Sequence, residues 1–505
     1  MHTELSDVGV RANSLRDMMI SGIGWSAVAQ AGNLSLRFAI SVVLARLLVP
    51  RDFGLVGMIA VFTGFTLLFS GFVFGHALIQ KGDIGERHYI SVFWVNLCIA
   101  LILTALVMVC APLIATFFGE PILVPLTRIM AFNLIALSLG SVQSAILRRK
   151  MEFRSLAAAD ITALVAGGLV GVILALLGYG VWSLVWQLLA NSTVRSVLLW
   201  RNSGWRPGLS FDRSAIADVW KFSTNLMGFN VLNYWVRNGD DMLIGRYLGG
   251  ASLGIYARAY SLMMLPLDHV YGVLTTVMFP ALSRVQGDTK RVKRIYLQSL
   301  AMIALVTFPM MIGLLVVAES FVLAIYGPKW HGMIPILRIF SVVGMLQSIG
   351  TTVGWIYQSQ GRTDWMFRWG LASGPLVIGS IVIGILIGTV EAVAMSYAIA
   401  GIILLYPLFA IPGKLIDMTV GNVVGAIAAT LGSAAAMGFL IWIVGELLPK
   451  EWPHWANLAV QVPIGMGVYG ALVHFLRLPA YQEARDIIRE KLQSRLRPAE
   501  YVVRP

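Results

Sequence analysis

Long apolar segments follow one another along almost the whole chain. Each is about twenty residues or more, which is enough to cross a hydrocarbon core of about 30 Å. The polar stretches between them are short and leave no room for a large soluble domain. The pattern predicts an all-α integral membrane protein with about 14 transmembrane helices. The expected spans are 22–47, 53–80, 90–117, 121–146, 156–177, 179–200, 216–246, 251–284, 295–325, 332–358, 365–388, 390–412, 416–446 and 454–477.

Composition supports this prediction. Hydrophobic residues make up 58% of the chain and charged residues 12%, and the mean hydropathy is +0.78. Soluble globular chains are far less apolar. The first twenty residues contain Glu4, Asp7 and Arg11 and no apolar core, so we do not expect a cleavable signal there.

The basic residues fall mainly on one side of the expected membrane. Only Arg46, Arg51, Arg246, Lys329 and Lys450 are placed on the other side by the span assignment. Because Lys and Arg accumulate in short cytoplasmic loops, this distribution predicts an even number of spans with both termini in the cytoplasm. The net charge of +13 then reflects contact with anionic lipid headgroups, and no nucleic-acid partner is needed to explain it.

Two parts of the chain resemble each other. "ARLLVPRDFGLV" (residues 45–56) and "GRYLGGASLGIY" (245–256) share Arg, Leu and a later Gly at an offset of 200 residues. "FFGEPILVPLTRI" (117–129) resembles "IYGPKWHGMIPILRI" (325–339), which aligns Gly119 with Gly327 and Arg128 with Arg338. Each copy holds about six spans, so both copies would enter the membrane in the same direction. Parallel repeats of this kind are a transporter architecture.

The repeat gives a domain organisation in five parts. They are a cytoplasmic N-terminal segment (1–21), a six-helix bundle (22–213), a second six-helix bundle related to the first by a parallel repeat (214–413), two additional transmembrane helices (414–477), and a basic amphipathic cytoplasmic tail (478–505). The tail either lies on the inner leaflet or forms a solvated helix without contacts.

The pattern R-N-x-D followed by "IGRYLG", then "LGIYARAYSLMMLP" and "MFPALSR", resembles the Wzx-type polysaccharide and lipopolysaccharide export flippases of the multidrug/oligosaccharidyl-lipid/polysaccharide (MOP) superfamily. The resemblance covers roughly residues 15–480. It implies two pseudo-symmetric six-helix bundles around a central cavity in the bacterial inner membrane. It also implies translocation of undecaprenyl-pyrophosphate-linked oligosaccharide from the cytoplasmic to the periplasmic leaflet by alternating access, for exopolysaccharide or O-antigen biosynthesis. Expected partners are this substrate, membrane lipids, a polysaccharide polymerase and a chain-length regulator.

Several polar residues lie within or near the expected spans. A charged side chain deep in the membrane normally faces a cavity or a partner, and guanidinium groups bind pyrophosphate bidentately. The candidate substrate-binding residues are Arg37, Asn225, Trp235, Arg237, Asn238, Asp240 and Arg258. For Arg237 the alternative is an intrahelical ion pair with Asp240 or Asp241. Tyr234, Trp235 and Trp355 would stack on sugar rings or else belong to interfacial belts or the lipid-facing surface.

Other charged residues have alternative interpretations. Arg46 and Arg246 occupy matching ends of two spans and are either snorkelling anchors or, with Asp241, members of a gate. Asp268 and His269 form a candidate proton relay, with structural hydrogen bonding or sugar contact as the alternatives. The family usually has neutral polar residues at these two positions. Arg128 and Arg338 share the same spacing after a proline, which favours a common structural role.

Other functions receive less support from the sequence. Within the superfamily, the alternatives are a peptidoglycan lipid-precursor flippase or a cation-coupled drug exporter. A membrane polysaccharide polymerase or ligase would need a sizeable outer loop, and every expected outer loop is short. A purely structural membrane scaffold gives no reason for buried arginines. No nucleotide-binding loop, metal-ligand spacing or cofactor motif occurs, so we expect neither an enzyme nor a bound cofactor.

Overall fold

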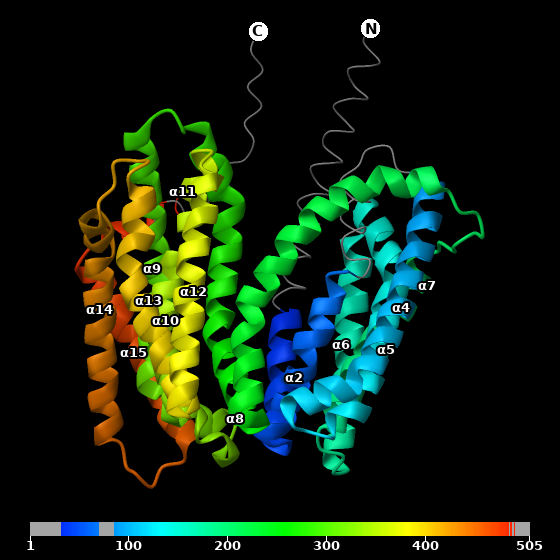
Figure 1. The fold of residues 1–505 in the computed structure, drawn as a ribbon. Coiled ribbons are helices and arrows are strands. Elements are labelled where there is room, and N and C mark those ends of the chain that lie inside the picture. Colours follow the sequence, from blue (N-terminus) through cyan, green and yellow to red (C-terminus); the bar gives the residue numbers. More distant parts are fainter. Residues whose placement is uncertain (1–31, 70–84, 484, 487–488, 490–505) are drawn as a thin grey trace, which may run out of the picture. The chain divides into compact units, whose positions relative to one another are not determined.

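The computed structural model describes residues 32–69, 85–483, 485–486 and 489, with the side chains of 213–233, 236–237, 269, 273, 276–277 and 279 left out (Figure 1). Every regular element in these ranges is helical. Nine helices of the described part are long and apolar enough to cross a membrane. The expected all-α, multi-pass membrane fold is therefore confirmed, while the number of fourteen spans stays a prediction.

The chain folds as two compact units. Unit 1 is Met1–Gly254 and unit 2 is Ile255–Pro505. The described helices of unit 1 are residues 32–47, α2 (Pro50–Leu67), α4 (Glu86–Phe118), α5 (Leu123–Arg149), α6 (Phe153–Leu176), α7 (Trp182–Ser203) and the first half of α8 (Arg213–Arg284). Unit 2 contains the second half of α8, α9 (Thr289–Ile325), η1 (Pro328–Trp330), α10 (Met333–Gly350), α11 (Val353–Ser359), α12 (Thr363–Ile387), α13 (Val390–Gly413), α14 (Val420–Leu447) and α15 (His454–Phe475).

Helix α8 is two helices joined at Gly249. This residue has φ 83° and ψ 175°, a backbone conformation that is essentially restricted to glycine. The joint lies between the two spans expected at 216–246 and 251–284. The expected span 332–358 is interrupted in the structure, where it divides into α10 and α11 around Thr351 and Thr352.

Contacts between loops and helix ends fix which ends of unit 1 lie together. At one end, Arg87 at the start of α4 pairs with Asp212 at 3.4 Å, and the Trp94 indole donates to the Gly208 carbonyl at 2.8 Å. At the other end, Arg51 pairs with Glu120 at 2.8 Å. The basic-residue pattern predicts the same grouping of these ends.

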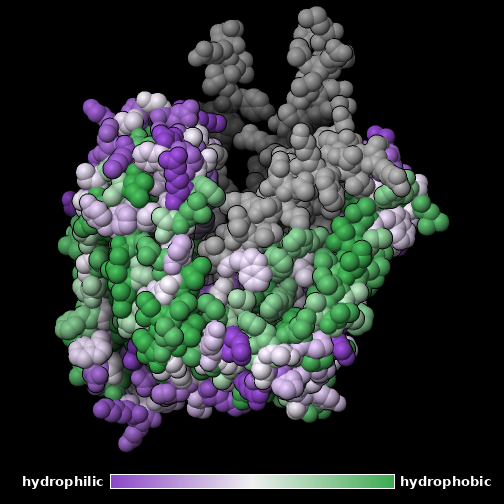
Figure 2. Space-filling model, in the orientation of Figure 1, coloured by the Kyte–Doolittle hydropathy of each residue, from purple (hydrophilic) through white to green (hydrophobic). Residues whose placement is uncertain are grey.

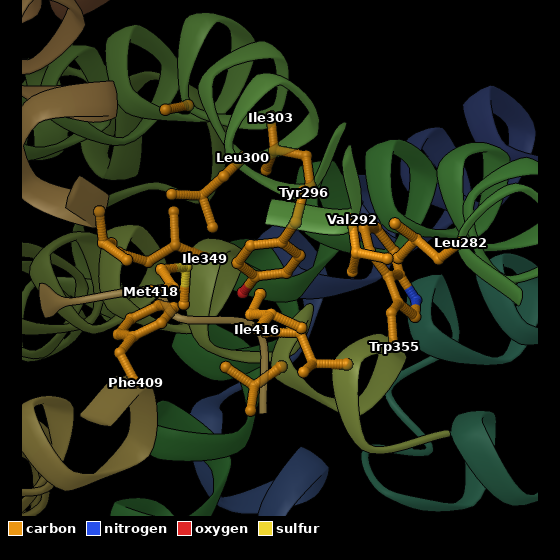
Figure 3. Packing of buried hydrophobic residues seen from close by; sticks show 14 of the residues in the cluster. Leu282, Val292, Tyr296, Leu300, Ile303, Ile349, Trp355, Phe409, Ile416 and Met418 are labelled. Atoms are coloured by element: carbon orange, nitrogen blue, oxygen red, sulfur yellow. The ribbon is translucent and has the colours of Figure 1, made fainter. Parts of the chain in front are cut away.

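The core of unit 2 forms around Tyr296 of α9 (Figure 3). Its hydroxyl is 2.8 Å from the Thr352 hydroxyl, so the polar atom is satisfied inside an apolar cluster. Trp355 is only 2% exposed and stacks on Tyr271 with ring centroids 5.6 Å apart. The structure therefore assigns Trp355 to packing and does not support its interpretation as a residue that stacks on sugar.

The outward faces of the helices are apolar. Ile102, Val109 and Leu113 of α4 are exposed, as are Leu386 of α12 and Tyr406 of α13. On unit 2, Figure 2 shows hydrophobic residues over the middle of the helices and hydrophilic residues at their ends. Such a surface is stable in lipid, which provides an apolar environment for these side chains.

The second sequence repeat also appears in the backbone. Gly119 follows α4 with φ 72°, and its counterpart Gly327 follows α9 with φ 90°. Both positions need the conformational freedom of glycine. After each turn the chain enters the next helix, α5 or α10, at corresponding places. The two arginines of this repeat have different environments. Arg338 lies 3.4 Å from Glu319, whereas Arg128 is exposed and has no ion pair within the described part of the chain.

Candidate functional site

The candidate site is the seam inside unit 1 where α2 packs on the first half of α8. The Tyr234 hydroxyl donates to the Val61 carbonyl at 2.6 Å and also lies 3.3 Å from the Ala60 carbonyl. A Cβ added to Gly64 would lie 2.6 Å from this hydroxyl. The glycine therefore makes room for a side chain from α8 to reach the backbone of α2.

An aromatic group lies beside this hydrogen bond. The Phe65 ring is 5.9 Å from the Tyr234 ring and 5.0 Å from the Trp235 ring, with tilted planes. Trp235 is half-buried and keeps part of its surface accessible. Partly exposed aromatic rings beside polar groups are well suited to stack on the apolar faces of sugars.

Polar side chains continue along α8 for the next turn. The Asn238 amide donates to the Tyr234 carbonyl at 2.8 Å. Asp240 and Asp241 follow, and the Asp241 backbone N–H donates to the Asp240 carboxylate at 2.9 Å. All three side chains are half-buried. Carboxylate and amide groups bind sugar hydroxyls, and the carboxylates also attract cations.

The seam ends in a reciprocal helix crossing. A Cβ on Gly54 would lie 1.7 Å from the Gly250 carbonyl oxygen, and a Cβ on Gly254 would lie 1.9 Å from the Pro50 carbonyl oxygen. In the sequence repeat, Gly54 corresponds to Gly254 and Pro50 to Gly250, at the same offset of 200 residues. Equivalent positions of the two repeats therefore contact each other in a two-fold-like manner, and the contact requires glycine on both sides.

Arg246 lies on α8 between Asp241 and the helix crossing, and its guanidinium is close to aromatic rings. Its guanidinium is 5.7 Å from the Phe117 ring and 5.8 Å from the Tyr247 ring. The described side chains of Arg246 and Asp241 form no ion pair with each other. These contacts favour the anchor interpretation of Arg246, because an exposed cation over aromatic rings is held at a helix end without a carboxylate. Arg46 is also exposed at its helix end.

The remaining candidates belong to other parts of the chain. Arg37 is exposed and donates to Asn33 of its own helix at 2.7 Å. Arg258, half-buried, and Asp268, exposed, belong to unit 2. The side chains of Asn225, Arg237 and His269 lie outside the described residues. The structure thus brings together Trp235, Asn238, Asp240 and Asp241, while the predicted cationic contacts and the Asp268–His269 relay stay predictions.

An ion pair that the sequence analysis missed lies between α6 and α7. Arg195 Nε is 2.6 Å from Asp160 Oδ1. The sequence did contain an indication of this pair, because Arg195 falls inside the expected span 179–200 and Asp160 falls inside the expected span 156–177. Each was a charged residue at membrane depth without an assigned partner.

Comparison with known sequences shows the family to which this chain is related. Residues 43–335 match the family described as "Polysaccharide biosynthesis protein". The succinoglycan biosynthesis transport protein ExoT of Rhizobium meliloti is 31% identical over 73% of this chain and 75% of its own length. The lipopolysaccharide biosynthesis protein WzxC of Escherichia coli is 28% identical over 74% of this chain and 76% of its own. The teichuronic acid biosynthesis protein TuaB of Bacillus subtilis is 27% identical over 95% of this chain and 99% of its own.

Comparison with solved structures shows the fold. The lipid II flippase MurJ in an inward closed conformation matches with a TM-score of 0.71 at 16% identity, over 90% of this chain and 99% of MurJ. An inward-facing multidrug resistance MATE transporter of the MOP superfamily matches with a TM-score of 0.61, over 76% of this chain and 94% of its own. The chain has the MOP transporter fold, and by the match over residues 43–335 and the identity to ExoT it belongs to the polysaccharide biosynthesis protein family.

Proposed function

We propose that this protein is a flippase that moves lipid-linked oligosaccharide units from the cytoplasmic to the periplasmic leaflet of a bacterial inner membrane. In this proposal both termini are cytoplasmic and the lipid carrier is undecaprenyl pyrophosphate. One observation carries it: the relatives are named for polysaccharide biosynthesis or transport, while the fold is that of a lipid flippase.

The residues of the α2–α8 seam support the proposal that the substrate contains a sugar. Trp235 offers a ring face, and Asn238, Asp240 and Asp241 offer hydrogen-bonding groups within about two turns of the same helix. Cationic side chains would bind the pyrophosphate, and Arg237 and Arg258 are the candidates. Alternating access would move the bound headgroup between leaflets while the lipid tail stays in the membrane.

The direct test is deletion of the gene in its host, followed by analysis of lipid-linked intermediates. We expect oligosaccharide linked to undecaprenyl pyrophosphate to build up on the inner leaflet and the exported polysaccharide to disappear. Complementation with the intact gene should reverse both effects. Normal polysaccharide export without accumulation in the deletion strain would rule the proposal out.

Trp235 provides a test of the seam. Replacing Trp235 with leucine is expected to weaken substrate binding about threefold to tenfold, because an aromatic stacking contact contributes about 0.5–1.5 kcal/mol beyond area burial. Trp235→Phe should retain most of the binding. Export measured in complemented deletion cells, together with the thermal midpoint of the purified variant, separates this effect from misfolding.

The matched control is Trp186→Leu, since Trp186 is a partly exposed tryptophan of α7 that is not in the seam. Equal losses of export in the Trp235 and Trp186 variants would contradict the assignment of Trp235 to the substrate site.

A cation-coupled drug exporter is the second candidate, and one observation favours it. Asp240 and Asp241 place two carboxylates side by side in the seam, and such groups attract cationic compounds. This candidate predicts that deletion raises sensitivity to cationic drugs and leaves lipid-linked oligosaccharide unchanged. The same deletion strain therefore distinguishes the two functions.

A further inference from the structure

Unit 1 carries a groove on its surface between α5 and α7, away from the α2–α8 seam. The groove has a volume of about 730 Å³. Its floor is formed by small residues where the two helices meet: Ser196 donates its hydroxyl hydrogen to the Ala136 carbonyl, and a Cβ on Gly140 would lie 2.8 Å from the Ser196 hydroxyl. The hydroxyl hydrogen of Ser196 is thus already used within the protein.

The walls of the groove are apolar. Phe132, Ile135 and Leu139 line it from α5, and Val197 lines it from α7. Phe132 is 48% exposed and Val197 is 62% exposed. The stretch from Phe132 to Leu139 extends over about 10 Å of helix, well inside the apolar length of α5. A wall of this kind at membrane depth fits a hydrocarbon chain.

One end of the groove is cationic. Arg206 donates through Nη1 to the Trp200 and Trp205 carbonyls at 2.9 and 3.2 Å, and its guanidinium lies 5.4 Å from the Trp200 ring centroid. These contacts fix the guanidinium in place. Arg201 also lines the groove and is exposed, and no carboxylate is among the lining residues.

A groove with apolar walls and two guanidinium groups at one end is suited to bind an acyl chain that carries a phosphate. Guanidinium groups bind phosphate oxygens bidentately, and a tryptophan ring is favoured at headgroup depth. Because both charged residues of the lining are basic, a headgroup with net negative charge is favoured over a zwitterionic one.

We propose that this groove is a binding site for an anionic phospholipid, of which phosphatidylglycerol is the test compound. The phosphate is held between Arg201 and Arg206, and one acyl chain lies along α5 and α7. The site is separate from the transport seam and does not depend on which substrate the protein carries.

Native mass spectrometry of the purified full-length protein tests the proposal, with phosphatidylglycerol and phosphatidylcholine titrated in parallel. We expect phosphatidylglycerol to be retained preferentially. Arg201→Gln is expected to weaken its retention about fivefold, since one basic residue near a membrane surface contributes about that factor. Val197→Trp, which fills the groove and keeps both charges, should weaken the retention of either lipid.

Lys150→Gln is the matched control, because Lys150 is an exposed cation at the end of α5 that does not line the groove. Thermal midpoints of all variants establish that each is folded. The proposal is overturned if the Arg201 and Lys150 variants retain phosphatidylglycerol equally, or if phosphatidylcholine binds as well as phosphatidylglycerol. It is also overturned if millimolar inorganic phosphate displaces the lipid and by itself raises the thermal midpoint as much as the lipid does.

Discussion

Replacing Gly54 with alanine is expected to destabilise the protein by about 3 kcal/mol, at the upper end of the usual cost of overpacking. The new methyl group would lie 1.7 Å from the Gly250 carbonyl oxygen, so α2 and α8 would have to separate along the crossing. A loss of this size lowers the amount of folded protein in cells several-fold. The thermal midpoint of the purified variant and its level in the membrane measure the effect.

The reciprocal variant Gly254→Ala should behave alike, since its methyl group would meet the Pro50 carbonyl at 1.9 Å. The double variant should cost less than the sum, because the helices are already separated by the first substitution. Gly57→Ala is the matched control one turn away on α2, where the nearest atom is Leu253 Cδ2 at an ordinary 3.4 Å. Equal midpoints for Gly54→Ala and Gly57→Ala would refute the close crossing.

Breaking the pair between Asp160 and Arg195 is the second large effect. Asp160 lies seven residues from the start of α6, about 10 Å along the helix, and inside the expected span 156–177, so we expect hydrocarbon and not water around it. Arg195→Leu leaves the carboxylate without its partner at 2.6 Å. Loss of one member of a fully buried pair costs about 3–5 kcal/mol because the remaining charge is uncompensated; since these side chains are 26% and 36% exposed, we expect about 2–3 kcal/mol here. The thermal midpoint should fall accordingly.

Removing both charges should recover most of this loss. In Asp160→Leu/Arg195→Leu no uncompensated charge remains, so we expect a coupling of about 2 kcal/mol between the two positions. The control is Arg51→Leu, which breaks a pair between the start of α2 and the turn after α4, with side chains 58% and 20% exposed. Because this arginine is exposed at a helix end, the loss should be at most about 1 kcal/mol. A double variant as unstable as Arg195→Leu alone would show that the pair is not the cause.

The positions of most described helices could be predicted from the sequence. Expected spans 390–412 and 454–477 correspond closely to α13 (Val390–Gly413) and α15 (His454–Phe475). Gly249 separates the two halves of α8 between the spans expected there. These predictions succeed because the length of an apolar run and the location of a glycine are local properties of the chain, which the thickness of the bilayer and backbone sterics convert directly into helix bounds.

The candidate site could be predicted only in part. The sequence pointed to Trp235, Asn238 and Asp240, which the structure places on one stretch of α8 beside α2. It offered no sign that Tyr234 reaches the Val61 carbonyl or that Arg246 lies over Phe117. Such contacts depend on how each helix is rotated about its axis.

The sequence by itself determined the membrane class, the approximate bounds of most described helices and the repeat that relates Gly54 to Gly254. Only the tertiary structure decided that these repeat-equivalent glycines meet, that Asp160 pairs with Arg195, and that Arg338 has an acidic partner while Arg128 has none within the described part. The physical reason is that lipid is as apolar as a leucine side chain. Hydropathy therefore does not distinguish a helix face that packs on protein from one that faces lipid, and the partners are chosen by close packing and polar contacts between distant segments.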